Sequence, residues 1–229
     1  MSDKADRVVA PGVQARLWDG PTRVVHWALV ALLAFSWWSA EEGNLEWHRW
    51  SGYAVLGLLV FRIYWGFAGS ASSRFGSFVK GPRATLAYLK TIPRKGAGDV
   101  PGHNPAGAWS VVAILLAILM QVTTGLFAVD VDGLESGPLS YMVDFDTGRI
   151  FAEVHEWSFT AIQVLVVLHV AAIAFYMIYK KNNLIGPMIT GRRRFESDPG
   201  LTFAPWWRLV LGAVIAFAIM WAISKGLRV

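Results

Sequence analysis

Residues 154–181 read VHEWSFTAIQVLVVLHVAAIAFYMIYKK, a long apolar stretch that contains two histidines, His155 and His169. Stretches of about 18 or more apolar residues are typical of membrane-spanning helices. On a helix, the fourteen positions between the histidines correspond to about 21 Å along the axis and to about 40° around it. One spanning helix is therefore expected to carry a histidine near each membrane surface, both on one face.

The composition of the whole chain also favours a membrane protein. Of its 229 residues, 55% are hydrophobic and only 16% are charged, and the mean hydropathy is positive. A soluble domain of this composition would have too little polar surface. We predict an all-α integral membrane protein with five spanning helices. The predicted spans are Val24–Ala40, Trp50–Gly69, Ala106–Val129, Phe151–Tyr179 and Trp206–Ser224.

Lysine and arginine are distributed unevenly between the predicted loops. Residues 1–23 carry four of them, residues 70–105 six and residues 180–205 five, whereas the loops near 41–49 and 130–153 carry one each. Since basic loops stay in the cytoplasm, we expect a multi-pass protein of the bacterial inner membrane with its N-terminus inside and its C-terminus in the periplasm. The net charge of +5 then reflects topology, so nucleic acid is not an expected partner.

The chain contains no cysteine. This excludes disulfides, iron–sulfur clusters held by thiolates, and covalent haem attachment through a Cys-x-x-Cys-His motif. Any haem in this protein would therefore be bound without thioether links.

Four of the five histidines form two pairs at matching depths in the predicted topology. His48 lies at the outer start of the second span, at the depth of His155. His26 lies near the inner start of the first span, at the depth of His169. His103 precedes the third span and has no partner, so we interpret it as a loop or helix-entry residue. Ionisable groups at such depths are costly, and two matched pairs indicate a function.

Two facing imidazoles can provide both axial ligands to the iron of a flat macrocycle. We therefore expect two b-type haems, an outer one held by His48 and His155 and an inner one held by His26 and His169. A zinc site would need a third or fourth ligand at the same depth. The alternatives are a metal-ion or proton transporter that uses the histidines as a relay, and a passive anchor in which each histidine only hydrogen-bonds a neighbouring helix.

Three further residues are candidates for contacts with the cofactor. Gly52 lies one turn after His48, where a haem plane would need room. Arg62 is the one arginine well inside an apolar span, and an anionic haem propionate would justify its position. A side chain that snorkels to the inner interface explains Arg62 equally well. Arg49, next to His48, is a weaker candidate for an outer propionate.

Several segments of the sequence resemble the prokaryotic cytochrome b561 family, which also includes the b-type cytochrome subunits of nickel–iron hydrogenases. The resemblance runs from Trp18 to Arg194, and the histidine spacing in the fourth span is its most specific part. The segments are TRVVHW (22–27), WHRWSGYAVLGLLVFRIYWGFAG (47–69), GHNPAGAW (102–109), VHEWSFTAIQVLVVLH (154–169) and NNLIGPMITGRRR (182–194).

The resemblance implies a four-helix bundle that holds two b haems, with the same four histidines as axial ligands. It divides the chain into a cytoplasmic segment (1–20), a four-helix di-haem cytochrome b561 domain (21–195), and an accessory fifth spanning helix with a tail (196–229). The fifth helix lies outside the core that small family members possess.

The resemblance further implies a respiratory electron-transfer oxidoreductase in the lipid bilayer, which passes electrons between quinone and a partner on one face. That partner could be a soluble periplasmic redox protein, or a hydrogenase or other reductase that the cytochrome subunit anchors; a homodimer also stays open. A cationic partner would be steered to the acidic outer loops, although the positive-inside bias explains this acidity equally well. The outer acidic residues are Glu41, Glu42, Glu46, Asp130, Asp132, Glu135, Asp144, Asp146, Glu153 and Glu156.

Overall fold

The computed structural model describes residues 12–92, 102–131 and 135–228; Asp132 lies outside them. Its longest helices include five that are apolar enough to cross a membrane. These overlap the five predicted spans one for one, so the prediction of an all-α multi-pass protein is confirmed. The five helices are α1 (Gly20–Glu41), α2 (Leu45–Ala68), α5 (Pro105–Phe127), α6 (Phe145–Ile178) and α8 (Trp206–Ser224).

An aspartate or asparagine caps the first turn of α1, α2, α5 and α6. The side-chain oxygen accepts a hydrogen bond from a backbone N–H three residues later, a donor that the helix leaves unsatisfied. In α1, for example, Asp19 accepts from the N–H of Thr22 at 2.8 Å. Asn44, Asn104 and Asp144 cap the other three helices in the same way. These caps explain where the helices begin, and the last of them places the start of α6 before the predicted Phe151.

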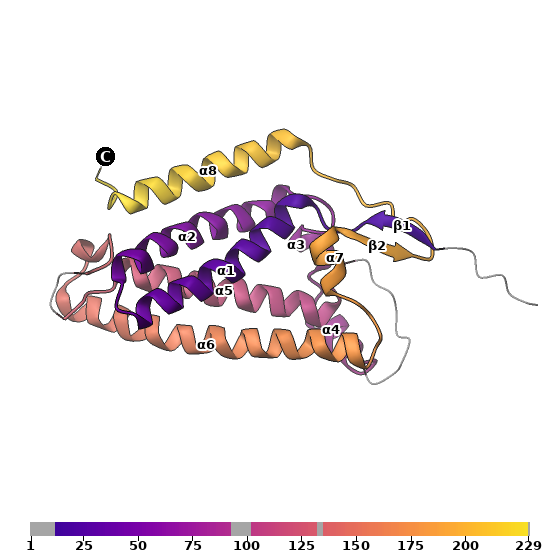
Figure 1. Cartoon of the computed structure of the whole chain (residues 1–229), viewed down its shortest axis with the longest axis horizontal. Helices are drawn as coiled ribbons and strands as arrows, with labels where there is room; N and C mark the ends of the chain where they lie inside the picture. The colour runs from indigo at the N-terminus through magenta and orange to yellow at the C-terminus, as the bar shows by residue number, and fades with distance from the viewer. Residues whose placement is uncertain (1–11, 93–101, 132–134, 229) are drawn as a thin grey trace, which may run out of the picture.

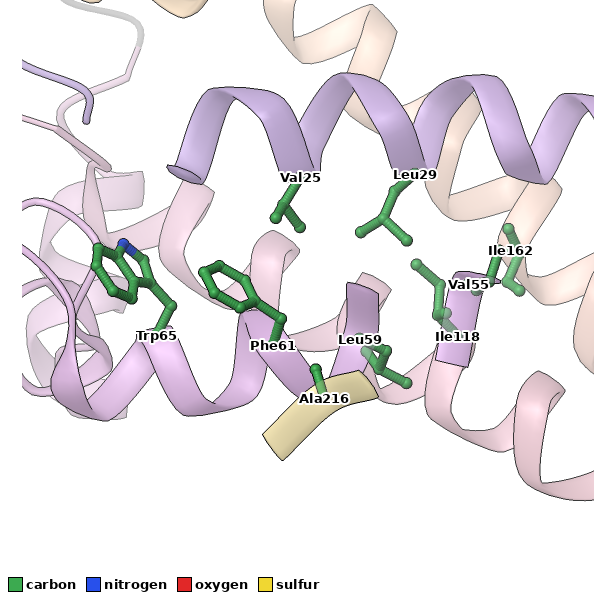
Figure 2. Packing of buried hydrophobic residues seen from close by; sticks show 9 residues of the cluster. All are labelled: Val25, Leu29, Val55, Leu59, Phe61, Trp65, Ile118, Ile162 and Ala216. Atoms are coloured by element: carbon green, nitrogen blue, oxygen red, sulfur yellow. The ribbon is translucent and has the colours of Figure 1, made fainter. Parts of the chain in front are cut away.

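The helices α1, α2, α5 and α6 lie side by side as a four-helix bundle, and α8 lies outside it along α2 (Figure 1). Figure 2 shows buried side chains of these helices that point toward one another. Many large apolar side chains on the outer faces of the helices are exposed, as a lipid environment allows. The buried cluster consists of Val25, Leu29, Val55, Leu59, Phe61, Trp65, Ile118, Ile162 and Ala216.

A small two-stranded sheet, which we did not predict, lies at one end of the bundle (Figure 1). Its strands β1 (Val13–Arg16) and β2 (Arg192–Phe195) pair antiparallel, with Val13 opposite Phe195. We call this end the strand end. The short helices of the structure at this end are α3 (Phe75–Phe78), α4 (Pro82–Leu89) and α7 (Ile185–Thr190).

The opposite end of the bundle, which we call the loop end, holds the turn at residues 42–44 and the connection between α5 and α6. That connection includes the 3₁₀ helix η1 (Ser140–Met142). The C-terminal end of α8 also reaches the loop end (Figure 1). The long spans thus alternate in direction along the bundle. The strand end carries the small sheet and the short helices, and the loop end carries the turn and the connection with η1.

Candidate functional site

The ring of His48 on α2 faces the ring of His155 on α6 toward the loop end. The ring centroids are 5.9 Å apart and the ring planes are nearly perpendicular, at 85°. A metal–imidazole bond is about 2 Å long. Two such bonds, together with the distance from each coordinating nitrogen to its own ring centre, add up to about this separation. The spacing of these two rings therefore fits one metal ion between them.

Backbone carbonyls fix the orientation of both rings. Nδ1 of His48 lies 2.9 Å from the carbonyl oxygen of Ser36 on α1. Nδ1 of His155 lies 2.8 Å from the carbonyl oxygen of Gln121 on α5. Because a carbonyl only accepts, each Nδ1 must carry the proton, and each Nε2 keeps its lone pair. This is the arrangement found in metal-binding histidines, whose second nitrogen donates to a carbonyl or carboxylate.

The side chain of Gln121 also contacts Nε2 of His155, the nitrogen that would bind a metal. Its Nε2 lies 2.9 Å from Nε2 of the histidine, and its Oε1 accepts a hydrogen bond from Ser158. A metal at His155 would take the lone pair to which this amide donates, so the amide must turn away when a metal binds. Sequence reasoning missed Gln121, although it is the only amide side chain in α5.

Two glycines shape the space around this pair. A Cβ added to Gly125 would lie 2.8 Å from Cε1 of His155, closer than real Cβ atoms approach, so this position brings α5 close to the ring. A Cβ added to Gly52 would meet no heavy atom within 4 Å. The position one turn after His48 therefore borders open space, which agrees with the room that a flat macrocycle would need.

The second pair lies toward the strand end. His26 lies near the start of α1 and His169 near the end of α6, so both lie toward this end of the bundle, and the electrostatic effect of His169 reaches His26. Nδ1 of His26 is buried and has no hydrogen-bond partner among the described residues. A buried polar atom without a partner costs about 1–3 kcal/mol. A bound group that gave this nitrogen a partner would remove that cost.

His103 lies just before α5, as expected, but it is not isolated. Its ring packs against Trp18 and Phe78, with centroids 4.8 and 4.6 Å away, and its Nδ1 is buried without a partner among the described residues. Burial, with a smaller effect of the nearby charges of Arg62, His169 and His26, lowers the pKa of His103 to about 3. The ring is therefore neutral, and it lies within the electrostatic reach of the second histidine pair, which the sequence did not indicate.

Arg62 is buried, with only 7% of its surface exposed. Its Nη1 donates to the carbonyl oxygen of Ser73 at 3.5 Å, and its guanidinium lies 5.1 Å from the ring centre of Phe75. Asp19 attracts this charge electrostatically. The side chain is thus held inside the protein at the strand end, an observation that disfavours the snorkelling alternative.

Asp19 organises the polar surroundings of Arg62. Its carboxylate accepts hydrogen bonds from the indole of Trp65 at 2.9 Å and from the hydroxyl of Ser73 at 3.2 Å, besides the capping bond from Thr22. Burial raises the pKa of this carboxyl, but the hydrogen bonds outweigh that effect and bring the pKa below its ordinary value. A negative charge therefore persists close to Arg62 at neutral pH.

Arg49 and its neighbour in sequence, His48, contact different parts of the molecule. Its Nη1 forms an ion pair with Glu135 at 2.7 Å, in the connection between α5 and α6. His48 instead contacts α1 through Ser36. The guanidinium of Arg49 is thus already paired, and its role toward a propionate stays a prediction.

The described residues contain no group of three or more His, Cys, Asp or Glu side chains that could hold a metal ion together. A zinc site, which needs at least three protein ligands, finds no support in this part of the chain. Two-histidine ligation of a metal that a macrocycle already holds is the chemistry that the pairs fit best.

Known proteins with similar sequences are b-type cytochromes. The family profile described as prokaryotic cytochrome b561 matches residues 17–191. The chain is 27% identical over 170 residues to a protein of Azotobacter chroococcum mcd 1 named probable Ni/Fe-hydrogenase B-type cytochrome subunit, covering 66% of this chain and 68% of the relative. It is 23% identical over 227 residues to the probable Ni/Fe-hydrogenase 1 B-type cytochrome subunit of Escherichia coli K12, covering 84% and 94%. No solved structure shows significant similarity to the chain.

Proposed function

The chain belongs to the prokaryotic cytochrome b561 family, and from this premise we propose how its histidines hold the haem of a membrane electron carrier. The protein is a multi-pass membrane cytochrome of the b type that functions in electron transfer. We assign two haems to it. His48 and His155 ligate one near the loop end, and His26 and His169 ligate the other near the strand end.

The facing rings of His48 and His155, with 5.9 Å between centroids, are the observation that carries this assignment. The protonated Nδ1 of each ring donates to a carbonyl, which leaves the lone pair of each Nε2 for iron once the Gln121 amide turns away from His155. The second pair is supported by the common position of His26 and His169 toward the strand end and by the unpartnered Nδ1 of His26. Residues 21–195 form the haem-binding unit in this proposal, and residues 196–229 are accessory to it.

A b-type haem supplies one-electron redox chemistry when bound. The contribution of the chain is to position it. A haem held between two of these histidines would have no free coordination position for a substrate, so the chemistry that it would supply is electron transfer without substrate binding to the iron. Since His155 and His169 are about 21 Å apart along α6, the two centres lie in series along the bundle. Arg62 provides a buried positive charge at the second centre, where a propionate would be its partner.

The partners of this electron carrier follow from its relatives and its surroundings. Two relatives are named as cytochrome subunits of nickel–iron hydrogenases, so we propose that a hydrogenase or another reductase docks on this chain. Quinone dissolved in the bilayer is the second proposed partner. The lysine and arginine distribution supports an inner-membrane protein with its strand end in the cytoplasm and its loop end in the periplasm.

Optical spectra of the purified full-length protein, oxidised in air and then reduced with dithionite, test the haem assignment. We expect b-type bands on reduction and a haem-to-protein ratio of two by the pyridine haemochrome assay. A ratio of one would remove one histidine pair from the proposal, and the absence of b-type bands would overturn the cytochrome function. Iron and zinc analysis of the same sample is expected to find two irons and no zinc per chain.

Reduction of the haems by defined donors in membrane vesicles then tests the partners. A quinol analogue should reduce the haems directly. Hydrogen should reduce them only when a hydrogenase is present. Failure of the quinol analogue would contradict the quinone assignment, and failure of hydrogen with hydrogenase present would point to a different reductase.

A further inference from the structure

A polar cavity of about 350 Å³ opens at the loop end, and none of the four paired histidines lines it. The start of α2, the residues around η1 and the tail that follows α8 form its walls. The cavity is positively charged and rich in hydroxyls, since its lining includes Arg49, Lys225, Arg228, Ser136, Ser140 and Ser224.

The cations of this cavity are incompletely neutralised. Arg49 pairs with Glu135, which is the one ion pair found among the described residues. Lys225 and Arg228 instead lie against aromatic rings, 4.9 Å from the centre of Trp221 and 4.0 Å from the centre of Tyr141. Both side chains are largely exposed. The cavity therefore keeps a positive charge at an end of the bundle where the loops are otherwise acidic.

Specific contacts hold the tail of α8 against the wall of the cavity. The hydroxyl of Tyr141 donates to the carbonyl oxygen of Gly226 at 2.7 Å. Gly226 is buried and has a φ of +66°, and a Cβ there would lie 3.0 Å from the carbonyl oxygen of Pro138. Only glycine adopts this conformation readily in so close an approach. The tail is thus fixed in place, and the positions of Lys225 and Arg228 follow from that.

The donors of the cavity match one kind of ligand. Arginine, lysine and hydroxyl groups are the usual donors to phosphate oxygens, and arginine can bind two oxygens at once. The C-terminal carbonyls of α8 would disfavour an anion, but Lys225 at the C-cap offsets their partial charge. The cavity also lies where a spanning helix reaches the membrane surface, which is the depth of phospholipid headgroups.

We propose that this cavity binds a phosphate group, and that the accessory helix α8 closes the site by carrying Lys225 and Arg228 to it. The phosphate can belong to the headgroup of an anionic phospholipid or to free phosphate in solution. Arg49 lines the cavity and is also the candidate for an outer propionate, whereas Lys225 and Arg228 have no part in the haem assignment, so the test uses these two residues.

Native mass spectrometry of the detergent-solubilised full-length protein tests the lipid source. The probes are phosphatidylglycerol and phosphatidylcholine, added at equal concentration. We expect one phosphatidylglycerol to bind in preference to phosphatidylcholine. Arg228→Gln should weaken this binding roughly fivefold to tenfold, since one surface cation contributes about 1 kcal/mol to the attraction of an anionic lipid. Arg149→Gln removes one positive charge at the same end without lining the cavity, and should change the affinity less than twofold.

Inorganic phosphate tests the second source of the phosphate group, which is free phosphate in solution. If phosphate at millimolar concentration raises the Tm of the wild type in phosphatidylcholine nanodiscs, and does so less for Arg228→Gln, free phosphate is the ligand. If only phosphatidylglycerol binds, the ligand is a lipid headgroup. The proposal is overturned if neither probe binds selectively, or if Arg149→Gln and Arg228→Gln weaken binding equally. Should Arg228→Gln fail to fold by circular dichroism, Lys225→Gln makes the same test.

Discussion

His48 and His155 face each other across 5.9 Å, and each is oriented by a carbonyl from a different neighbouring helix. The four bundle helices therefore meet at this level, because α2 and α6 supply the rings while α1 and α5 supply the carbonyls of Ser36 and Gln121. Such an arrangement fixes the tautomers before any metal binds. Because all four helices orient this site, a change to either histidine or to a residue that orients it is expected to disturb the whole site.

Histidine variants in pairs test which residues share a haem. Each of His48→Ala and His155→Ala should lower the haem-to-protein ratio from two to one, and the double variant should still retain one haem. Combining His48→Ala with His26→Ala should leave none. The pyridine haemochrome assay measures these ratios. His103→Ala is the matched control, because this fifth histidine is not an assigned ligand, and it should keep both haems.

A different outcome would reassign the ligands. If His48→Ala combined with His26→Ala retained one haem, these two histidines would share a single cofactor, and the pairing by depth would be wrong. Loss of a haem in His103→Ala would place that histidine among the ligands.

Gly125→Ala should reduce occupancy of the site at the loop end. The new Cβ would lie 2.8 Å from the ring of His155, so the ring must move from its place opposite His48. We expect the haem-to-protein ratio to fall toward one. Gly57→Ala is the matched control, since a Cβ there meets only the flexible side chain of Met220, at 3.5 Å. Both changes replace a helical glycine by alanine, and this replacement by itself stabilises a helix by about 0.5–1 kcal/mol. Full occupancy in Gly125→Ala would contradict this prediction and would show that α5 can move to make room for the new Cβ.

Much of the bundle could be predicted from local sequence signals. Five apolar runs of sufficient length gave the five spanning helices, and the fourteen-residue spacing of His155 and His169 put two histidines on one face of α6. These features follow from hydropathy and helix geometry alone. The start of α6 was less well predicted, because Asp144 extends the helix with residues that are too polar to resemble a span.

The features that were missed depend on contacts between distant parts of the chain. Strand β1 pairs with β2 across nearly the whole sequence, and two strands of four residues each carry no pattern that predicts it. The contacts of Gln121 with His155 and of Asp19 with Trp65 likewise exist only once the helices pack. Residues of these types are common in soluble loops and caps, so their types alone did not single them out.

Asp19→Asn should destabilise the protein at neutral pH. The carboxylate accepts three hydrogen bonds, and an amide can reproduce only some of them, so we expect a loss of roughly 1–3 kcal/mol. The pKa of Asp19 is below its ordinary value of 3.8 in the folded protein. Its stabilising effect is therefore complete above about pH 4 and is lost as the pH falls through the folded-state pKa. The Tm difference between wild type and variant should shrink accordingly in a series from pH 7 to pH 3.

The control for this series is Asp198→Asn. Asp198 accepts a hydrogen bond from the N–H of Gly200 in an exposed loop, so the change should alter stability by less than about 0.5 kcal/mol at every pH. A Tm difference for Asp19→Asn that stayed constant down to pH 3 would contradict an ionised carboxylate at this position.

Arg62→Gln should lower the reduction potential of the haem assigned to His26 and His169. A buried positive charge favours the reduced haem, which carries one positive charge fewer, and burial weakens solvent screening of that effect. Loss of about 1 kcal/mol of stabilisation corresponds to roughly 40 mV for one electron. A redox titration that resolves the two haems should show this shift in one haem and little change in the other. Arg208→Gln is the control, because it changes the net charge equally. Arg208 lies on α8, outside the four-helix bundle, where it donates to the carbonyl oxygen of Ala68. If Arg62→Gln and Arg208→Gln shifted the same haem equally, the effect would be one of net charge, and Arg62 would have no specific role at this centre.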